Sequence, residues 1–160
     1  MKKRSIGLVG FLLMSVWAGL AQASDQIMVE DAWIREAPPG AAAMAGYMIL
    51  HNHGDSERSL VSASSPAFAS VQLHRTVMEE GMAKMVHQKA ITVPAGGSVT
   101  FKPKDYHLML MKPKQALKAG DTVEVTLEFE DGNSMTVPYE VRSASDGMEH
   151  SAMSHGHMGH

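Results

Sequence analysis

The strongest constraint on the fold lies between residues 25 and 142, where short alternating or β-branched runs are separated by turn residues. A period of two is typical of half-buried strands, and no stretch keeps helical spacing of apolar residues over three turns. The intervening segments are rich in Pro, Gly, Asn and Asp, which favour turns. The pattern predicts strands at residues 26–30, 32–35, 43–52, 59–64, 71–77, 82–88, 98–103, 107–112, 122–129 and 135–142. We therefore expect one all-β domain, a β-sandwich or Greek-key barrel.

The first 23 residues have the layout of a secretory signal peptide. Residues 2–4 are Lys-Lys-Arg, residues 6–20 are mostly apolar, and residues 21–23 are Ala-Gln-Ala, a small-x-small cleavage site. The apolar run falls short of the roughly 20 residues needed to span a bilayer. We expect cleavage after Ala23, export to a bacterial periplasm, and a soluble monomer without a membrane span.

The composition excludes several chemistries. The 160 residues include 14 Met and 9 His but no Cys. Disulfides, Cys-based zinc sites, iron–sulfur clusters, thiolate copper centres and lipid attachment through Cys are therefore excluded. The formal net charge is −3, so a nucleic-acid partner has no basic surface to bind.

The last segment, residues 144–160, differs from the preceding domain at 24–143. It has no aliphatic residue larger than Ala, so we expect it to be disordered. Met-x-His pairs nevertheless repeat every five residues along it, a pattern that favours metal binding over a merely solubilising polar tail. The candidate ligands of this tail are Met148, His150, Met153, His155, His157, Met158 and His160.

A strand at 107–112 would place an imidazole beside thioethers. Side chains alternate between faces with a period of two, so His107, Met109 and Met111 would share one face. Such a pattern alone is more often ordinary packing than a metal site.

A predicted hairpin supplies a second His/Met pair. If strands 71–77 and 82–88 are symmetric about the Glu79–Glu80 bond, His74 lies opposite Met85. Directly opposed side chains have Cβ atoms about 4.5–5.5 Å apart, close enough to share one ion. Two such pairs on strand backbone could meet at one end of the domain.

The donor types select the metal. Thioether sulfur is a soft ligand with little affinity for magnesium, calcium or zinc, and imidazole suits late first-row ions, so the mixture favours Cu(I). The imidazoles must be neutral to bind. A site without thiols also survives an oxidising compartment, where Cys would form disulfides.

These residues resemble a known family. Ten residues separate His74 from Met85, and twenty-one separate Met85 from the His107-Leu108-Met109 segment. This spacing resembles the His-x10-Met-x21-His-x-Met signature of the periplasmic PCu(A)C copper chaperones. The resemblance covers roughly residues 29 to 142, although Lys104-Asp105 stands where the family usually has Gly. Further matching segments are Asp31-Ala32-Trp33, Ala45-Gly46-Tyr47-Met48, Asn52, Ser65-Pro66, residues 94–97 and Gly120-Asp121.

The resemblance implies a cupredoxin-like β-barrel that binds one Cu(I) near its surface through His74, Met85, His107 and Met109. It also implies delivery of copper to a cytochrome oxidase subunit, alone or with a thiol-bearing copper chaperone. Some members carry a Met/His-rich extension that binds further copper, including Cu(II), and the tail at 144–160 is similar to it.

Three more residues are candidate accessory ligands, namely Met78, His87 and Met111. Packing of the methionines and an exposed strand end for His87 are the simpler interpretations. No enzyme motif is present, so we expect a binding protein. The favoured hypothesis is a periplasmic copper chaperone. The alternatives are a copper-sequestering or resistance protein and, from another class, a β-sandwich interaction module.

Overall fold

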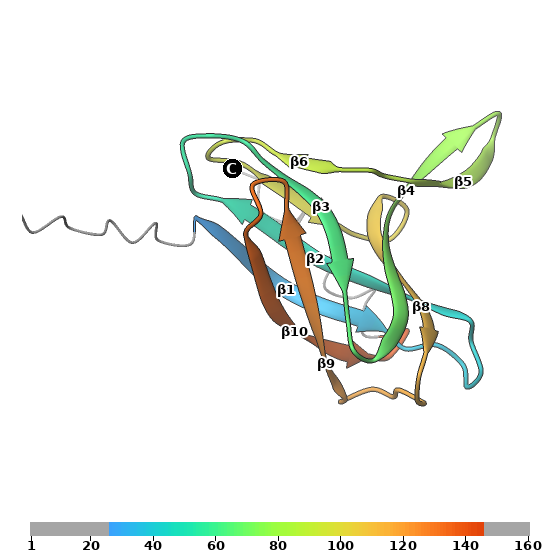
Figure 1. Ribbon diagram of the computed structural model, residues 1–160. Helices are drawn as coiled ribbons and strands as arrows, with labels where there is room; N and C mark the ends of the chain where they lie inside the picture. The colour runs from blue at the N-terminus through green and yellow to red at the C-terminus, as the bar shows by residue number, and fades with distance from the viewer. Residues whose placement is uncertain (1–25, 146–160) are drawn as a thin grey trace, which may run out of the picture.

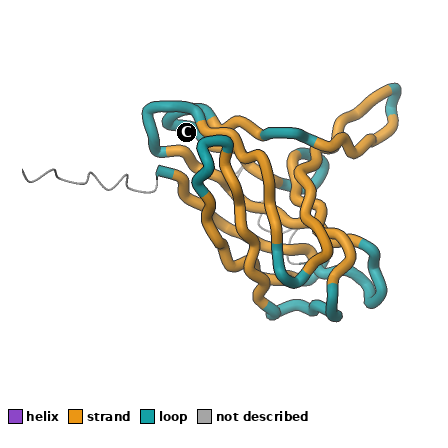
Figure 2. Tube along the Cα trace, in the orientation of Figure 1, coloured by secondary structure: helices purple, strands orange, loops and turns teal. Residues whose placement is uncertain are grey.

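The computed structural model describes residues 26–145. The predicted signal peptide and the candidate ligands of the tail lie outside this part of the chain. Within it the protein is all-β and contains no helix, as predicted (Figures 1 and 2). The strands are β1 (Ile27–Arg35), β2 (Ala43–Asn52), β3 (Arg58–Ser64), β4 (Phe68–Glu79), β5 (Met82–His87), β6 (Ile91–Val93), β7 (Ser98–Phe101), β8 (Tyr106–Pro113), β9 (Thr122–Phe129) and β10 (Ser134–Arg142).

The strands close into a barrel. The order β4-β8-β2-β1-β10-β9-β3 returns to its start because β3 also pairs with β4. All of these pairs are antiparallel except β1 with β10. The short strands β6 and β7 pair with β3 and β2. Strand β5 pairs with the part of β4 that projects beyond the barrel (Figure 1).

The strand predictions differ from the structure at two places. Residues 26–30 and 32–35 were expected as separate strands, but they form the single strand β1 with an irregularity between Glu30 and Trp33. Asp31 lies there with φ of 50°, so a bulge interrupts the alternation without ending the strand. The three-residue strand β6 was not predicted, because so short a run shows no period.

The interior is filled by one face of each main strand. Leu50, Leu108, Leu110, Leu127 and Tyr139 are fully buried, and they belong to one hydrophobic cluster. On β2 and β8 the residues between these inward positions face outward. His107 and Met109 therefore lie on the outer face of the barrel, where neighbouring side chains cover His107.

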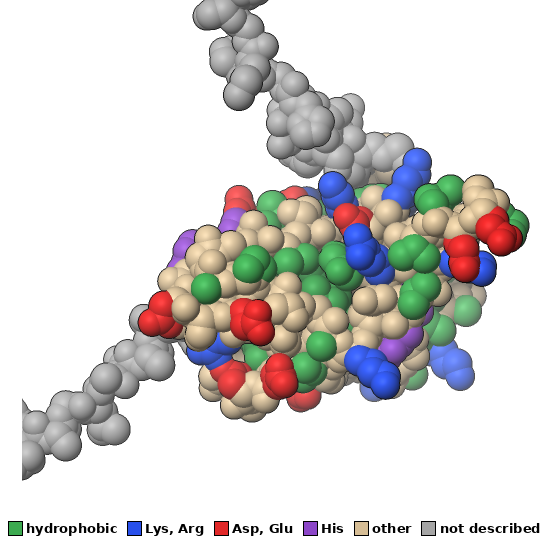
Figure 3. Space-filling view, turned by 90° about the horizontal axis from the view of Figure 1, so that it is seen from above, with side chains coloured by type: hydrophobic (Ala, Val, Ile, Leu, Met, Phe, Trp, Pro, Cys, Tyr) green, Lys and Arg blue, Asp and Glu red, His purple; other side chains and the backbone are tan. Residues whose placement is uncertain are grey.

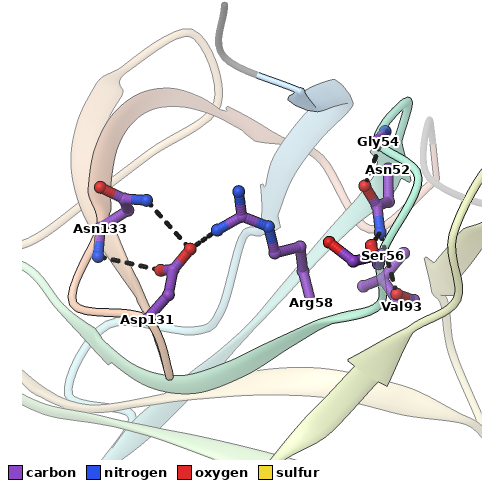
Figure 4. Close-up of polar contacts among 7 residues, drawn as sticks. All are labelled: Asn52, Gly54, Ser56, Arg58, Val93, Asp131 and Asn133. Atoms are coloured by element: carbon purple, nitrogen blue, oxygen red, sulfur yellow. Dashed lines mark hydrogen bonds and ion pairs between the residues drawn. The ribbon is translucent and has the colours of Figure 1, made fainter. Parts of the chain in front are cut away.

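A buried amide fixes the loop after β2 (Figure 4). Asn52 Nδ2 donates hydrogen bonds to the carbonyl oxygens of Ser56 (2.8 Å) and Val93 (3.2 Å), and Asn52 Oδ1 accepts one from Gly54 N (3.0 Å). A Cβ on Gly54 would lie 2.4 Å from Gln26 Oε1, so a larger residue here would displace the end of the Gln26 side chain. The loop after β2 is thus held closely against its neighbours.

An ion pair closes the same end of the barrel. Arg58, at the start of β3, pairs with Asp131 in the β9–β10 turn. Asp131 in turn accepts hydrogen bonds from the backbone and side-chain nitrogens of Asn133 (Figure 4).

The turn before β8 is strained at one residue. Lys104 has φ of 67°, in the left-handed region that favours Gly, and it stands where the PCu(A)C pattern usually has Gly. Hydrogen bonds from Lys102 N to Tyr106 O (2.9 Å) and from Asp105 N to Lys102 O (3.1 Å) hold the turn. A left-handed conformation costs a residue with a Cβ about 1–2 kcal/mol.

Replacing Lys104 by Gly should therefore stabilise the protein by about 1 kcal/mol, because glycine adopts this conformation without a Cβ clash. Urea denaturation measures the change. Lys102→Gly, in the same turn but with ordinary φ, is the matched control and should lower the stability. A Lys104→Gly variant no more stable than the wild type would contradict the assignment of strain.

Candidate metal site

The β4–β5 hairpin brings the first set of predicted ligands together, in a register that differs from the prediction. Glu79 pairs with Met82, and the two turn residues, Glu80 and Gly81, have φ of 51° and 80°. Positive φ at both positions is typical of a type I′ turn. The predicted symmetry about the Glu79–Glu80 bond was wrong, because it took no account of this two-residue turn.

The corrected register places His74 opposite His87, whereas Met85 lies opposite Thr76. His74 and Met85 are therefore diagonal neighbours on one face. Diagonal Cβ atoms are about 7–8 Å apart, which long side chains can bridge. Met85 is long, unbranched and 61% exposed, so its sulfur remains free to turn toward His74.

Strand β8 supplies the second set from the other side of β4. His107 lies directly opposite His74, and Met109 lies opposite Gln72. The rings of His74 and His107 have centroids 5.8 Å apart. All four predicted ligands thus project from one outer face, with His74 at the centre, His107 beside it, and the two methionines on its diagonals.

Hydrogen bonds fix which nitrogen each imidazole offers. His107 Nδ1 lies 3.0 Å from the Asp105 carbonyl oxygen, which can only accept, so Nδ1 carries the proton. His74 Nε2 donates in the same way to Gln72 Oε1 at 3.0 Å. In each neutral ring the opposite nitrogen then keeps its lone pair.

Those two opposite nitrogens have no hydrogen-bond partner in the described part of the chain. Among residues 26–145, His74 Nδ1 and His107 Nε2 are the only buried side-chain nitrogen or oxygen atoms without a hydrogen bond. Leaving a buried polar atom unsatisfied costs about 1–3 kcal/mol. Two such atoms on directly opposed residues fit a shared external ligand such as a metal ion.

Sequence analysis missed the two residues that orient these rings. Gln72 and the Asp105 carbonyl each precede by two positions the histidine that they hold. In metal sites such partners set the tautomer and orientation of the ligating imidazole. Alternation along β4 could have indicated Gln72, but a backbone carbonyl leaves no mark in the sequence.

Imidazole and carboxylate side chains of residues 26–145 do not by themselves form a metal site. No group of three His, Cys, Asp or Glu side chains within the described part of the chain could hold a metal ion. A metal bound between His74 and His107 would therefore need other donors, and the nearby donors on the same face are His87 and the thioethers of Met85 and Met109.

The accessory candidates lie at different distances from this centre. His87 is exposed at the end of β5, as expected, with its ring centroid 5.8 Å from that of His74. Met78 pairs with Ala83 near the hairpin tip and is 70% exposed. Met111 lies opposite Ser70, beyond Met109 and farther from His74. Only His87 is a direct neighbour of the centre.

The environment favours the neutral form of His74. Burial lowers the pKa of this imidazole below the ordinary value of 6.5, and the nearby His107 and His87 lower it further. A neutral imidazole is the form that binds metals.

A closed β-barrel with paired imidazoles and thioethers on its outer face defines the class of protein, a cupredoxin-like domain with a candidate soft-metal site. The family described as "Putative lipoprotein LpqE-like" matches residues 27–141. A relative from Leifsonia xyli subsp. xyli (strain CTCB07), "Putative lipoprotein Lxx21020", is 35% identical over 127 residues, or 79% of this chain and 75% of that protein. The chain belongs to the LpqE-like family.

Solved structures agree with this assignment. The Cu(I)-bound DR1885 of Deinococcus radiodurans is 36% identical, with a TM-score of 0.62 over 76% of this chain and 81% of that one. The copper-bound PCuAC domain from PmoF2 is 27% identical, with a TM-score of 0.63 over 74% of this chain and 93% of that one. The predicted resemblance to the PCu(A)C family and the cupredoxin-like fold are thus confirmed. Residues 26–145 contain no helix that is long and apolar enough to cross a membrane.

The lowered pKa of His74 is directly measurable. In an NMR titration of the metal-free protein, the imidazole of His74 should titrate with a midpoint below 6.5. Because burial is the largest cause, His87→Gln should raise the midpoint only slightly. Folding stability attributable to His74 should be present above pH 6.5 and decline as the pH falls below it, because the unfolded chain binds the proton more tightly. A midpoint at or above 6.5 would contradict the described burial.

Proposed function

We propose that this protein is a periplasmic copper chaperone that carries one Cu(I) ion between His74, Met85, His107 and Met109. The observation that supports it best is the pair of buried, unpartnered nitrogens, His74 Nδ1 and His107 Nε2, on directly opposed residues. Membership of a family with copper-bound solved relatives supports it as well.

The donor set suits monovalent copper. Two imidazoles and two thioethers are neutral and include soft sulfur, which favours Cu(I) over harder divalent ions. The bound ion would keep its single positive charge, and the site has no carboxylate to bind a competing hard cation. The chain orients the imidazoles beforehand through Gln72 and Asp105, so binding requires little reorganisation of the rings.

The exposure of the ligands supports transfer over storage. His107 is only 4% exposed, whereas Met85 is 61% exposed on the projecting hairpin. A ligand from an acceptor could therefore replace Met85 while the imidazoles still hold the ion. We infer that copper leaves by such stepwise ligand exchange, with a copper site of cytochrome oxidase as the acceptor.

Export of the chain is part of this proposal. The lipoprotein names of its relatives agree with a location in the cell envelope. This chain has no Cys for a lipid, so the basic and apolar segment at residues 2–20 would direct export. The Met-x-His tail would capture additional copper, including Cu(II), and raise its concentration near the folded site.

Substitution of Met109 tests the folded site. Met109→Leu keeps the volume but removes a sulfur. It should weaken anaerobic Cu(I) binding at this site by more than about tenfold, which is the smallest loss of affinity typical when even an outer-shell partner of a metal site is removed. Met111→Leu, one outward position farther along β8, is the matched control and should bind like the wild type. Competition with a chromophoric Cu(I) chelator measures both affinities.

X-ray absorption on a variant ending at Ser145, which lacks the tail ligands, should show nitrogen and sulfur neighbours around copper. Equal affinities for the two Leu variants, or a shell of nitrogen alone, would contradict the thioether ligands. Retention of Cu(I) against an apo-oxidase copper domain would instead favour sequestration.

Methionine oxidation offers an independent test. Met82 and Met85 are 60% and 61% exposed, so peroxide should oxidise both in the metal-free protein. Ag(I), a redox-inert analogue of Cu(I), should protect Met85, whose sulfur it binds, but not Met82, which lies on the opposite face of the hairpin. Mass spectrometry of the peptides measures this, and equal protection of both residues would count against Met85 as a ligand.

A further inference from the structure

A second cluster of side chains of the types found in metal sites lies on the outer face of the barrel, at the far end of β2. It consists of His51, His53, Glu30 and Met28. Sequence spacing alone gave no reason to assign His51 and His53 a role, and the copper site proposed above does not use them.

The structure brings these four residues together. His51 Nε2 lies 2.8 Å from Glu30 Oε2. The rings of His51 and His53 are nearly parallel, with an interplanar angle of 9° and centroids 5.9 Å apart. Met28 lies directly opposite His51 in the β1–β2 register and is 47% exposed.

The intervening residue makes the His-x-His segment rigid. Asn52 is 1% exposed, and its side chain is fully bonded inside the barrel (Figure 4). The backbone is held too, because Asn52 N donates to Gly97 O (2.8 Å) and His53 N donates to Gln26 O (2.7 Å). Both imidazoles are thus carried on a fixed backbone, which lowers the cost of gathering them around an ion.

Glu30 selects the nitrogen that His51 offers. A carboxylate only accepts hydrogen bonds, so Nε2 of His51 must be the donor, and Nδ1 of the neutral ring keeps its lone pair. A carboxylate behind a ligating imidazole fixes its orientation and raises its basicity. Glu30 therefore serves as the orienting partner of His51 and not as a metal ligand.

We propose that His51 Nδ1 and the His53 imidazole form a second metal site, which takes a divalent late first-row ion and Cu(II) above all. Two neutral imidazoles completed by water suit this class of ion, and affinity among its members peaks at Cu(II). Within residues 26–145 no group of three His, Asp or Glu side chains forms a metal site here, so water would complete the coordination and the ion could exchange readily.

This site is separate from the proposed Cu(I) site. Met109 lies opposite Ala45 on β2, and His51 is six residues farther along the same strand, about 20 Å at the usual rise of a strand. Figure 3 shows histidine surface in two separate places on one face of the molecule. The two sites can therefore be occupied and tested independently.

Paramagnetic broadening in the full chain tests the proposal residue by residue. Cu(II) is added in steps to the metal-free, 15N-labelled protein, and the backbone amide signals are followed. The amides of residues 28, 51, 53 and 98 should broaden as one set, distinguishable from any set around His74 and from any set in residues 146–160. Absence of broadening of this set up to three equivalents would overturn the proposal.

Substitutions identify the ligands. In a His51→Gln, His53→Gln double variant the set should no longer broaden, while every other set remains as in the wild type. Glu30→Gln should weaken Cu(II) binding at this set by about tenfold, as expected for a second-sphere partner. Glu128→Gln, an exposed carboxylate on β9, controls for the loss of charge and should have no effect. Broadening that persists in the double variant, or equal effects of the two Gln substitutions, would show that these residues do not hold the ion.

Discussion

The central position of β4 is the constraint on which the candidate copper site depends. This strand pairs with β5 on one side and with β8 on the other, and both registers place an imidazole opposite His74. A shift of either neighbour by one residue would turn its ligands to the opposite face of the sheet. The apolar residues that alternate with the ligands, such as Leu108, are fully buried, so the packing of the core also fixes the register of the site.

Much of this arrangement could be predicted from the sequence, because alternation of apolar and polar residues with a period of two indicates both the strands and the face of each side chain. It correctly indicated an all-β domain and placed His107 and Met109 on a common face. It did not give the hairpin register, since that depends on the positive φ of Glu80 and Gly81, which the sequence suggests only weakly. It also split β1, because a bulge at Asp31 interrupts the pattern without ending the strand.

The residues of the two proposed metal sites differ in ways that follow from their places on the barrel. His107 is buried between strands and lies near thioethers, which favours a soft ion held away from water. His51 and His53 are near a strand end with a carboxylate behind one ring, which favours a harder, hydrated ion. The two proposed sites on this outer face would thus discriminate between the two oxidation states of copper by the donors that they offer.

The two rings of the proposed Cu(I) site are held by different kinds of acceptor, and this affects how they tolerate mutation. One carbonyl, that of Asp105, accepts hydrogen bonds from both His107 Nδ1 and Thr76 N. Every amino acid supplies a backbone carbonyl, so the orientation of His107 is preserved whichever side chain occupies position 105. His74 depends on the side chain of Gln72, and a single substitution removes that support. Substitutions at these positions can therefore alter the orientation of the His74 ring while they leave that of the His107 ring unchanged.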